Sequence, residues 1–168
     1  VPQAYRMLRT QVLQRVRQHS VRALGVVSAV DGEGKTLTAA NLAMGVAAES
    51  NQNVLLVDLD LRKPSLAGLL GLQVEAGLEA WFAGVASIGD ICHGIEGVER
   101  LEVIPTLAPI RASSEMLATR RTQEMLHDLK TAQREGLVIF DLPPVLLTDD
   151  FLTVAPLLDG VVLVVSEG

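Results

Sequence analysis

Two kinds of hydrophobic pattern alternate along this chain. Residues 3–19 repeat apolar side chains every three to four positions among Arg and Gln, which predicts an amphipathic helix. Short aliphatic runs then recur at wide intervals. The runs at 54–57, 137–140 and 161–165 are apolar at successive positions, which is typical of strands covered on both faces.

The remaining segments complete an alternation of strands and helices. The predicted order is helix 3–19, strand 23–28, helix 36–49, strand 54–58, short helical pieces across 65–83, strand 101–104, helix 113–134, strand 137–141, a short helix near 149–155 and strand 160–166. Such alternation predicts an α/β fold: a three-layer, doubly wound, mostly parallel sheet with right-handed crossovers. Residues 84–97 contain four glycines and show neither period, so we expect a surface loop with short turns there.

Composition narrows the class of protein. The 168 residues suffice for one domain with a sizeable core, and the net charge of −6 argues against a nucleic-acid partner. The single cysteine, Cys92, excludes an internal disulfide and is typical of a reducing compartment. No run is long enough to span a membrane and the start does not resemble a signal peptide, so we expect a soluble cytoplasmic domain. Because position 1 is Val, we expect a fragment of a longer protein.

A glycine-rich turn links the first predicted strand to the helix at 36–49. Residues 29–36 read Ala-Val-Asp-Gly-Glu-Gly-Lys-Thr, which is the order of parts that a phosphate-binding loop needs. Its glycines allow a tight turn, so that backbone N–H groups near the helix N-terminus can face a phosphate. The residues expected to hold nucleotide are Asp31, Gly32, Glu33, Gly34, Lys35, Thr36 and Leu37. The competing interpretation is an ordinary strand–turn–helix, since Ala29 stands where the usual pattern has glycine.

Within this loop, Lys35 suits the β- and γ-phosphate oxygens and the Thr36 hydroxyl suits Mg²⁺. Two other strands end in carboxylates, Asp58 with Asp60 and then Asp141 before a Pro-Pro pair. Ligands in such sheets bind at the carboxyl ends of the strands, where all these groups would meet. We therefore expect Thr36, Asp58 and Asp141 to hold magnesium, and Lys35, Asp58 and Asp60 to act in catalysis. Ordinary strand-ending aspartates are the competing interpretation.

Two basic residues follow the first carboxylate pair. Arg62 and Lys63 could touch phosphate or pair with Asp60, and the sequence does not choose between these roles.

Together these motifs resemble the bacterial tyrosine kinases of capsule and exopolysaccharide export. The phosphate loop at 29–36, the apolar run into Asp-x-Asp-x-Arg at 55–62 and the apolar run into Asp-x-Pro-Pro at 138–144 occur in the family's order, and the helix opening at 113–117 is also similar. The resemblance implies an ATP- and Mg²⁺-dependent tyrosine autokinase. It also implies a phosphate-loop fold related to septum-positioning and partition ATPases, with 21–168 as the kinase domain.

The first helix, within a segment at 1–20, adds an oligomerisation motif by the same resemblance. The family carries Glu-x2-Arg-x2-Arg there, and this chain has Gln3, Arg6 and Arg9. The resemblance implies that both arginines contact a neighbouring subunit in a ring. It also implies activation by the cytoplasmic segment of a membrane polysaccharide co-polymerase, which recruits the kinase to the inner face of the membrane. A solvated basic helix face is the alternative interpretation.

Two departures bear on function. Family kinases usually end in a tyrosine-rich tail, whereas this chain has one tyrosine, Tyr5; a tail and the segment that helps hold adenine are expected past Gly168. Septum-positioning ATPases carry a signature lysine where Val30 stands, which disfavours them. The alternative function is a non-kinase regulatory ATPase that switches assembly on a polysaccharide co-polymerase.

Overall fold

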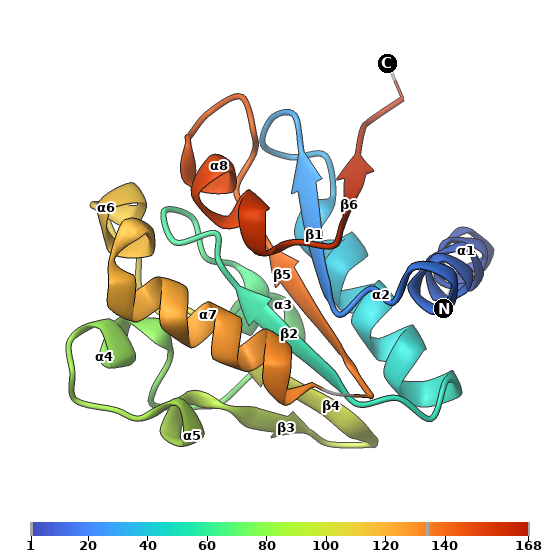
Figure 1. The fold of residues 1–168 in the computed structure, drawn as a ribbon, viewed down its shortest axis with the longest axis horizontal. Coiled ribbons are helices and arrows are strands. Elements are labelled where there is room, and N and C mark those ends of the chain that lie inside the picture. The colour runs from blue at the N-terminus through green and yellow to red at the C-terminus, as the bar shows by residue number, and fades with distance from the viewer. Residues whose placement is uncertain (1, 134, 168) are drawn as a thin grey trace.

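In the part of the chain that the structure describes, six strands form one twisted sheet, and helices cover both of its faces (Figure 1). The computed structural model describes residues 2–133 and 135–167. The strands are β1 (Ala23–Ser28), β2 (Val54–Asp58), β3 (His93–Ile95), β4 (Val98–Ile104), β5 (Leu137–Asp141) and β6 (Gly160–Val164). The helices are α1 (Gln3–His19), α2 (Lys35–Glu49), α3 (Leu66–Leu70), α4 (Leu78–Phe82), α5 (Ile88–Ile91), α6 (Ser113–Ala118), α7 (Arg120–Ala132) and α8 (Asp150–Val154), followed by the 3-10 turn η1 (Ala155–Leu157).

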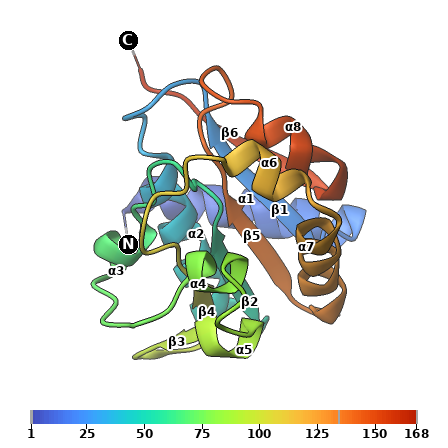
Figure 2. The same ribbon diagram turned by 90° about the vertical axis from the view of Figure 1, so that its left-hand side faces the viewer.

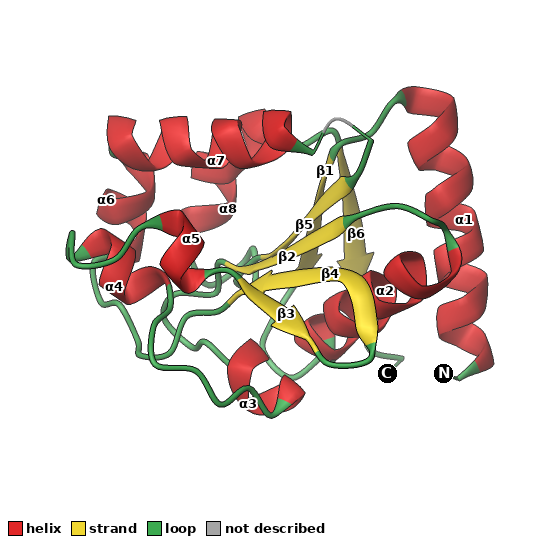
Figure 3. Ribbon diagram, turned by 90° about the horizontal axis from the view of Figure 1, so that it is seen from below, coloured by secondary structure: helices red, strands yellow, loops and turns green. Residues whose placement is uncertain are grey.

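The strand order is β3-β4-β2-β5-β1-β6, and every pairing is parallel except β3 with β4. The three-layer, mostly parallel sheet expected from the sequence is therefore confirmed. In Figure 3, α1 and α2 lie on one side of the sheet, and α4 to α8 lie toward the other. Because β1, β2 and β5 are adjacent and parallel, their carboxyl ends meet at one edge. None of the described helices is long and apolar enough to cross a membrane.

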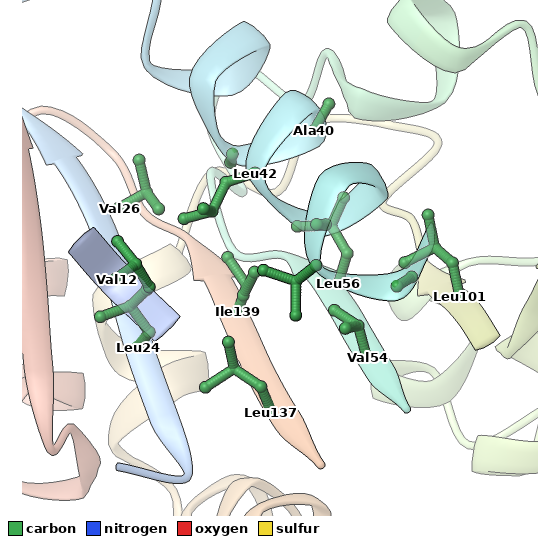
Figure 4. Packing of buried hydrophobic residues seen from close by; sticks show 14 of the residues in the cluster. Val12, Leu24, Val26, Ala40, Leu42, Val54, Leu56, Leu101, Leu137 and Ile139 are labelled. Atoms are coloured by element: carbon green, nitrogen blue, oxygen red, sulfur yellow. The ribbon is translucent and has the colours of Figure 1, made fainter. Parts of the chain in front are cut away.

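Side chains alternate between the two layers along each central strand. Leu56 of β2 and Ile139 of β5 point to the face that α2 covers, together with Leu24 of β1 (Figure 4). Their neighbours, such as Val57 and Phe140, point into a second core beneath α7. The β period of two therefore explains why these strands are apolar at every position.

Strand β6 departs from the expectation of coverage on both faces. It lies at the edge of the sheet, where Val161 and Leu163 are 45% and 59% exposed. Only the alternate residues Val162 and Val164 pack against the core beneath α1 and α2. The prediction was wrong because an aliphatic run does not reveal whether a strand is central or at an edge.

The glycine-rich stretch at 84–97 is more ordered than expected. It contains α5, begun by a capping box in which Ser87 and Asp90 exchange hydrogen bonds, and then β3. A turn through Gly97, whose φ is +80°, pairs β3 with β4 in a hairpin. The hairpin starts β4 at Val98 rather than at the expected residue 101.

The helix expected at 113–134 is two helices. The chain leaves helical geometry at Thr119, where ψ is 145°, and the Thr119 hydroxyl accepts a hydrogen bond from the amide of Thr122. This side chain caps a new helix start, so α6 and α7 can take different directions. Residue 134, the expected end, lies outside the described residues.

Candidate active site

The phosphate loop joins β1 to α2 at the carboxyl edge of the sheet. Gly32 and Gly34 have φ angles of +83° and +82°, a conformation in which other residues are strained. Gly34 is the N-cap of α2, so Lys35 and Thr36 occupy its first turn. A helix N-terminus behind a glycine turn directs N–H groups and a positive partial charge toward an anion.

Lys35 is the buried cation of the site. Only 6% of the residue is exposed, and its Nζ lies 2.8 Å from Asp141 Oδ1 and 3.2 Å from Asp60 Oδ2. Burial alone would lower the pKa of Lys35, but the carboxylates of Asp141 and then Asp60 outweigh burial and raise it. Lys35 therefore remains charged at neutral pH.

Asp58 lies in register with Asp141 on the neighbouring strand. Its carboxylate accepts hydrogen bonds from the amides of Asp60 and Leu66, at 3.1 and 3.2 Å. Burial, followed by repulsion from Asp141, raises the pKa of Asp58 well above its usual range despite these two amides. Burial likewise raises the pKa of Asp141, against the opposing effect of Lys35. A carboxylate with a raised pKa is suited to accept a proton.

Three carboxyl groups, from Asp58, Asp60 and Asp141, are buried in this cluster with one ammonium, that of Lys35, which contacts Asp60 and Asp141. This excess of buried negative charge is what a divalent cation would relieve. Thr36 Oγ1 lies 2.8 Å from Asp141 Oδ2, so a hydroxyl and a carboxylate adjoin one position. Among the described residues, no three Asp, Glu, His or Cys side chains enclose a metal by themselves. That donor set fits Mg²⁺, which uses few protein oxygens and takes the rest from phosphates and water.

A cleft of about 360 Å³ opens over these groups. Its lining residues are Ser28, Asp31, Gly32, Gly34, Lys35, Thr36, Leu37, Asp60, Lys63 and Ser65. Most of the residues expected to hold nucleotide therefore line one cavity, and Asp60 forms part of its wall. Asp58 and Asp141 are fully buried beneath.

Glu33 is the one residue of the expected set at 31–37 that is not among the cleft-lining residues. Its carboxylate accepts hydrogen bonds from the amides of Ala29, Val30 and Ser166. The Val30 amide, followed by that of Ser166, lowers the pKa of Glu33, so the side chain is ionised at neutral pH.

The two basic residues after Asp60 have partners that the sequence did not suggest. Lys63 Nζ lies 2.6 Å from Asp31 Oδ2 at the rim of the cleft. Arg62 Nε donates to the buried Ser113 hydroxyl at 2.8 Å, and Ser114 next to it bonds Asp149 and Asp150. This network connects the loop after β2 to the starts of α6 and α8. The pattern at 113–117 was visible in the sequence, but its contact with Arg62 depends on the tertiary fold.

The arginines of α1 differ from each other. Arg9 forms an ion pair with Glu49 of α2, and its aliphatic stem packs over Gly45. Arg6 is exposed. Arg9 is thus engaged within the chain, whereas Arg6 presents its charge to solvent.

A family model described as an AAA domain matches residues 22–166. Tyrosine-protein kinase YwqD of Bacillus subtilis is 33% identical over 165 residues, which are 98% of this chain and 68% of that protein. Tyrosine-protein kinase wzc of Salmonella typhi is 31% identical over 148 residues, covering 88% of this chain but only 20% of that protein.

Solved structures of a tyrosine-kinase domain and of a septum site-determining protein also match this chain. The kinase domain of Escherichia coli tyrosine kinase ETK matches with a TM-score of 0.82 and 28% identity, covering 95% of this chain and 61% of that chain. The septum site-determining protein MinD from Pyrococcus horikoshii, complexed with Mg-ADP, matches with a TM-score of 0.69 and 26% identity, covering 85% of this chain and 57% of that chain.

Proposed function

The chain belongs to the AAA-domain family and, within it, to the tyrosine-protein kinases, and on that premise we propose that it transfers the γ-phosphoryl group of ATP to a tyrosine hydroxyl. The observation that carries this proposal is the buried cluster of Lys35 with Asp58, Asp60 and Asp141 beneath the phosphate loop. Such a cluster provides both a cation for phosphate and carboxylates for a metal and a proton.

Each residue has a distinct role in this mechanism. The turn through Gly32 and Gly34 and the first turn of α2 bind the phosphates, and Lys35 neutralises charge on the β- and γ-oxygens. Thr36 and Asp141 would hold magnesium, with Asp58 behind them acting directly or through water. When bound, magnesium draws charge from the phosphate oxygens.

The transfer itself needs one proton acceptor. The tyrosine oxygen forms a bond to the γ-phosphorus as the bond between that phosphorus and the β–γ bridging oxygen breaks, and ADP leaves. The hydroxyl proton passes to Asp58 or Asp60. Asp60 forms the cleft wall and Asp58 has the raised pKa, so both remain candidates. Most of the rate enhancement comes from positioning and electrostatics.

The biological role we propose is regulation of capsule or exopolysaccharide polymerisation and export. It rests on the family's motifs at 29–36, 55–62 and 138–144. The kinase would act at the inner face of the membrane on contact with the cytoplasmic segment of a polysaccharide co-polymerase. Exposed Arg6 on α1 supports contact with a second subunit in a ring.

Replacement of the loop lysine tests the proposed activity. Lys35→Met should abolish phosphotyrosine formation on an added tyrosine-containing polymer with Mg·ATP. Among the described residues, Lys35 is the one cation that forms an ion pair with Asp60 and Asp141, so no other side chain replaces its charge. Arg120→Met, on the exposed face of α7, is the matched control and should retain activity. Retained transfer by Lys35→Met would refute the assignment.

One observation favours a second candidate, a regulatory ATPase that switches assembly. The fold also matches that of MinD, a septum site-determining protein solved with Mg-ADP. The same assay, run on the full-length protein with its partner, distinguishes the kinase from the regulatory ATPase. Slow release of phosphate without any phosphotyrosine would favour the regulatory ATPase.

A further inference from the structure

Glu33 lies within the phosphate loop, yet its side chain is directed away from the phosphate position. The residues on both sides of it, Gly32 and Gly34, line the cleft, whereas Glu33 is not among the lining residues. Both flanking glycines have positive φ angles, +83° and +82°. Glu33 is therefore placed to act on the loop rather than on the nucleotide.

The two carboxylate oxygens of Glu33 have separate partners. Oε2 accepts hydrogen bonds from the amides of Ala29 and Val30, at 2.8 and 3.1 Å. These amides begin the loop, and a carboxylate that holds both of them fixes how the chain leaves β1. The N–H groups closer to α2 then keep the orientation that phosphate requires.

Oε1 contacts a different part of the chain. It accepts from the Ser166 amide at 3.2 Å and from the Ser166 hydroxyl at 3.3 Å. Ser166 follows β6, and Figures 1 and 2 both show this segment beside the loop between β1 and α2. One side chain thus bridges the connections that leave two adjacent parallel strands.

We propose that Glu33 is a positioning residue that holds the phosphate loop in its phosphate-receiving shape and ties it to the segment at 165–167. The inference rests on the proposed function in one respect, that the loop binds a nucleotide through its phosphates. Both oxygens are used on N–H and O–H donors of the chain itself, which distinguishes Glu33 from Asp60 in the cleft wall.

Binding of a fluorescent ADP in the presence of Mg²⁺ tests the first half. Glu33→Ala removes both sets of hydrogen bonds and should raise the Kd by about tenfold or more. Glu33→Gln keeps one carbonyl oxygen, which should remain on the two closer loop amides, so its Kd should stay within about threefold of wild type. Glu75→Ala, at an exposed loop position, is the control and should bind as wild type does.

Hydrogen exchange of the segment at 160–167 tests the second half. The Ser166 amide should exchange faster in both Glu33→Ala and Glu33→Gln, because the Gln amide group that faces Ser166 cannot accept its N–H. If Glu33 only stabilised the fold, Glu33→Gln would not speed exchange at Ser166 while leaving the Kd for ADP near that of wild type. If Glu33→Ala fails to fold, Glu33→Gln decides: Ser166 exchange equal to wild type would overturn the tie.

Lys35→Met distinguishes failure of the inference from failure of the proposed function. If Lys35→Met weakens ADP binding while Glu33→Ala binds within threefold of wild type, the role of Glu33 is wrong and the phosphate loop stands. If Lys35→Met also binds as wild type does, the proposed nucleotide site itself is wrong.

Discussion

The charge of each residue in the site depends on its buried neighbours. Lys35 stays protonated because Asp141 and Asp60 adjoin it, and Asp58 is driven toward its protonated form by burial and by Asp141. The sequence predicted which residues meet here, because strand ends and a glycine turn are local patterns. It did not predict the partners of Glu33, Arg62 or Lys63, since those depend on how distant loops pass one another.

Asp58→Asn separates chemistry from folding at this scale. One Asp58 oxygen accepts the Asp60 amide and the other accepts the Leu66 amide, and Asn can accept only one of the two, so we expect the free energy of unfolding to fall by about 1 to 3 kcal/mol while the protein still folds. The rate of transfer should fall by about 10²- to 10⁴-fold if Asp58 receives the proton or supports magnesium. Thermal unfolding and initial-rate assays on one preparation measure both. Asp60→Asn, assayed alongside, shows which carboxylate matters more, and a wild-type rate in both variants contradicts the mechanism.

Among the elements, α1 is attached to the core through both apolar and charged contacts. Val12 and Val16 pack into the core beneath α2, and Arg9 pairs with Glu49. The amphipathic pattern predicted the helix and its buried face. The ion pair was not predictable, because it requires knowing that α1 crosses the end of α2.

Arg9→Ala and Arg6→Ala should therefore differ in stability. Loss of the Arg9 stem over Gly45 and of the ion pair should lower the free energy of unfolding by about 1 kcal/mol. Arg6→Ala, three residues earlier and exposed, is the matched control and should have the same denaturation midpoint as wild type. Equal denaturation midpoints for the two variants would show that Arg9 does not anchor the helix.

Asp159 joins the starts of β6, β1 and the end of α7. It accepts from the Arg22 and Ala23 amides at 2.8 and 3.0 Å, and Lys130 lies 2.9 Å away. Partial burial opposes its charge, but the Arg22 amide, Lys130 and the Ala23 amide together hold the pKa of Asp159 below its usual value. A lowered pKa in the folded state means that the ionised form stabilises the fold.

Asp159→Asn should consequently lose about 1 kcal/mol of stability at pH 7. The contribution is fully present above the ordinary aspartate pKa of about 4 and is lost as the pH falls through the lower pKa of the folded state. The difference between wild type and variant should thus shrink below about pH 4. Denaturant titrations from pH 3 to 7 measure it, with exposed Asp128→Asn as the control. A difference that grows toward low pH has the wrong sign for this account.

For the whole molecule, the order of elements was enough to predict the layered sheet but not its edges. The antiparallel β3–β4 hairpin was not predicted because part of it lies in the glycine-rich stretch at 84–97. The exposed face of β6 was not predicted because that strand is apolar at every position. Neither pattern indicates which strand lies next to the segment or whether a helix covers it. The central strands were predictable because two helical layers impose the same apolar requirement on both of their faces.

Self-association is the prediction that belongs to the molecule as a whole. Arg6→Ala should reduce oligomer formation with Mg·ATP and the co-polymerase segment, because Arg6 is exposed while Arg9 is engaged by Glu49. Sedimentation velocity measures the distribution. Gln11→Ala, also exposed on α1, is the control, and an unchanged profile for Arg6→Ala would count against the ring.

The most direct test of the central claim is the identity of the phosphorylated residue. The protein is incubated with Mg·ATP and a polypeptide that offers serine, threonine and tyrosine, and the product is sequenced by mass spectrometry. The account predicts phosphate on tyrosine oxygen with wild type and none with Lys35→Met. Phosphate on serine or threonine alone, or equal tyrosine phosphorylation by both proteins, would contradict it.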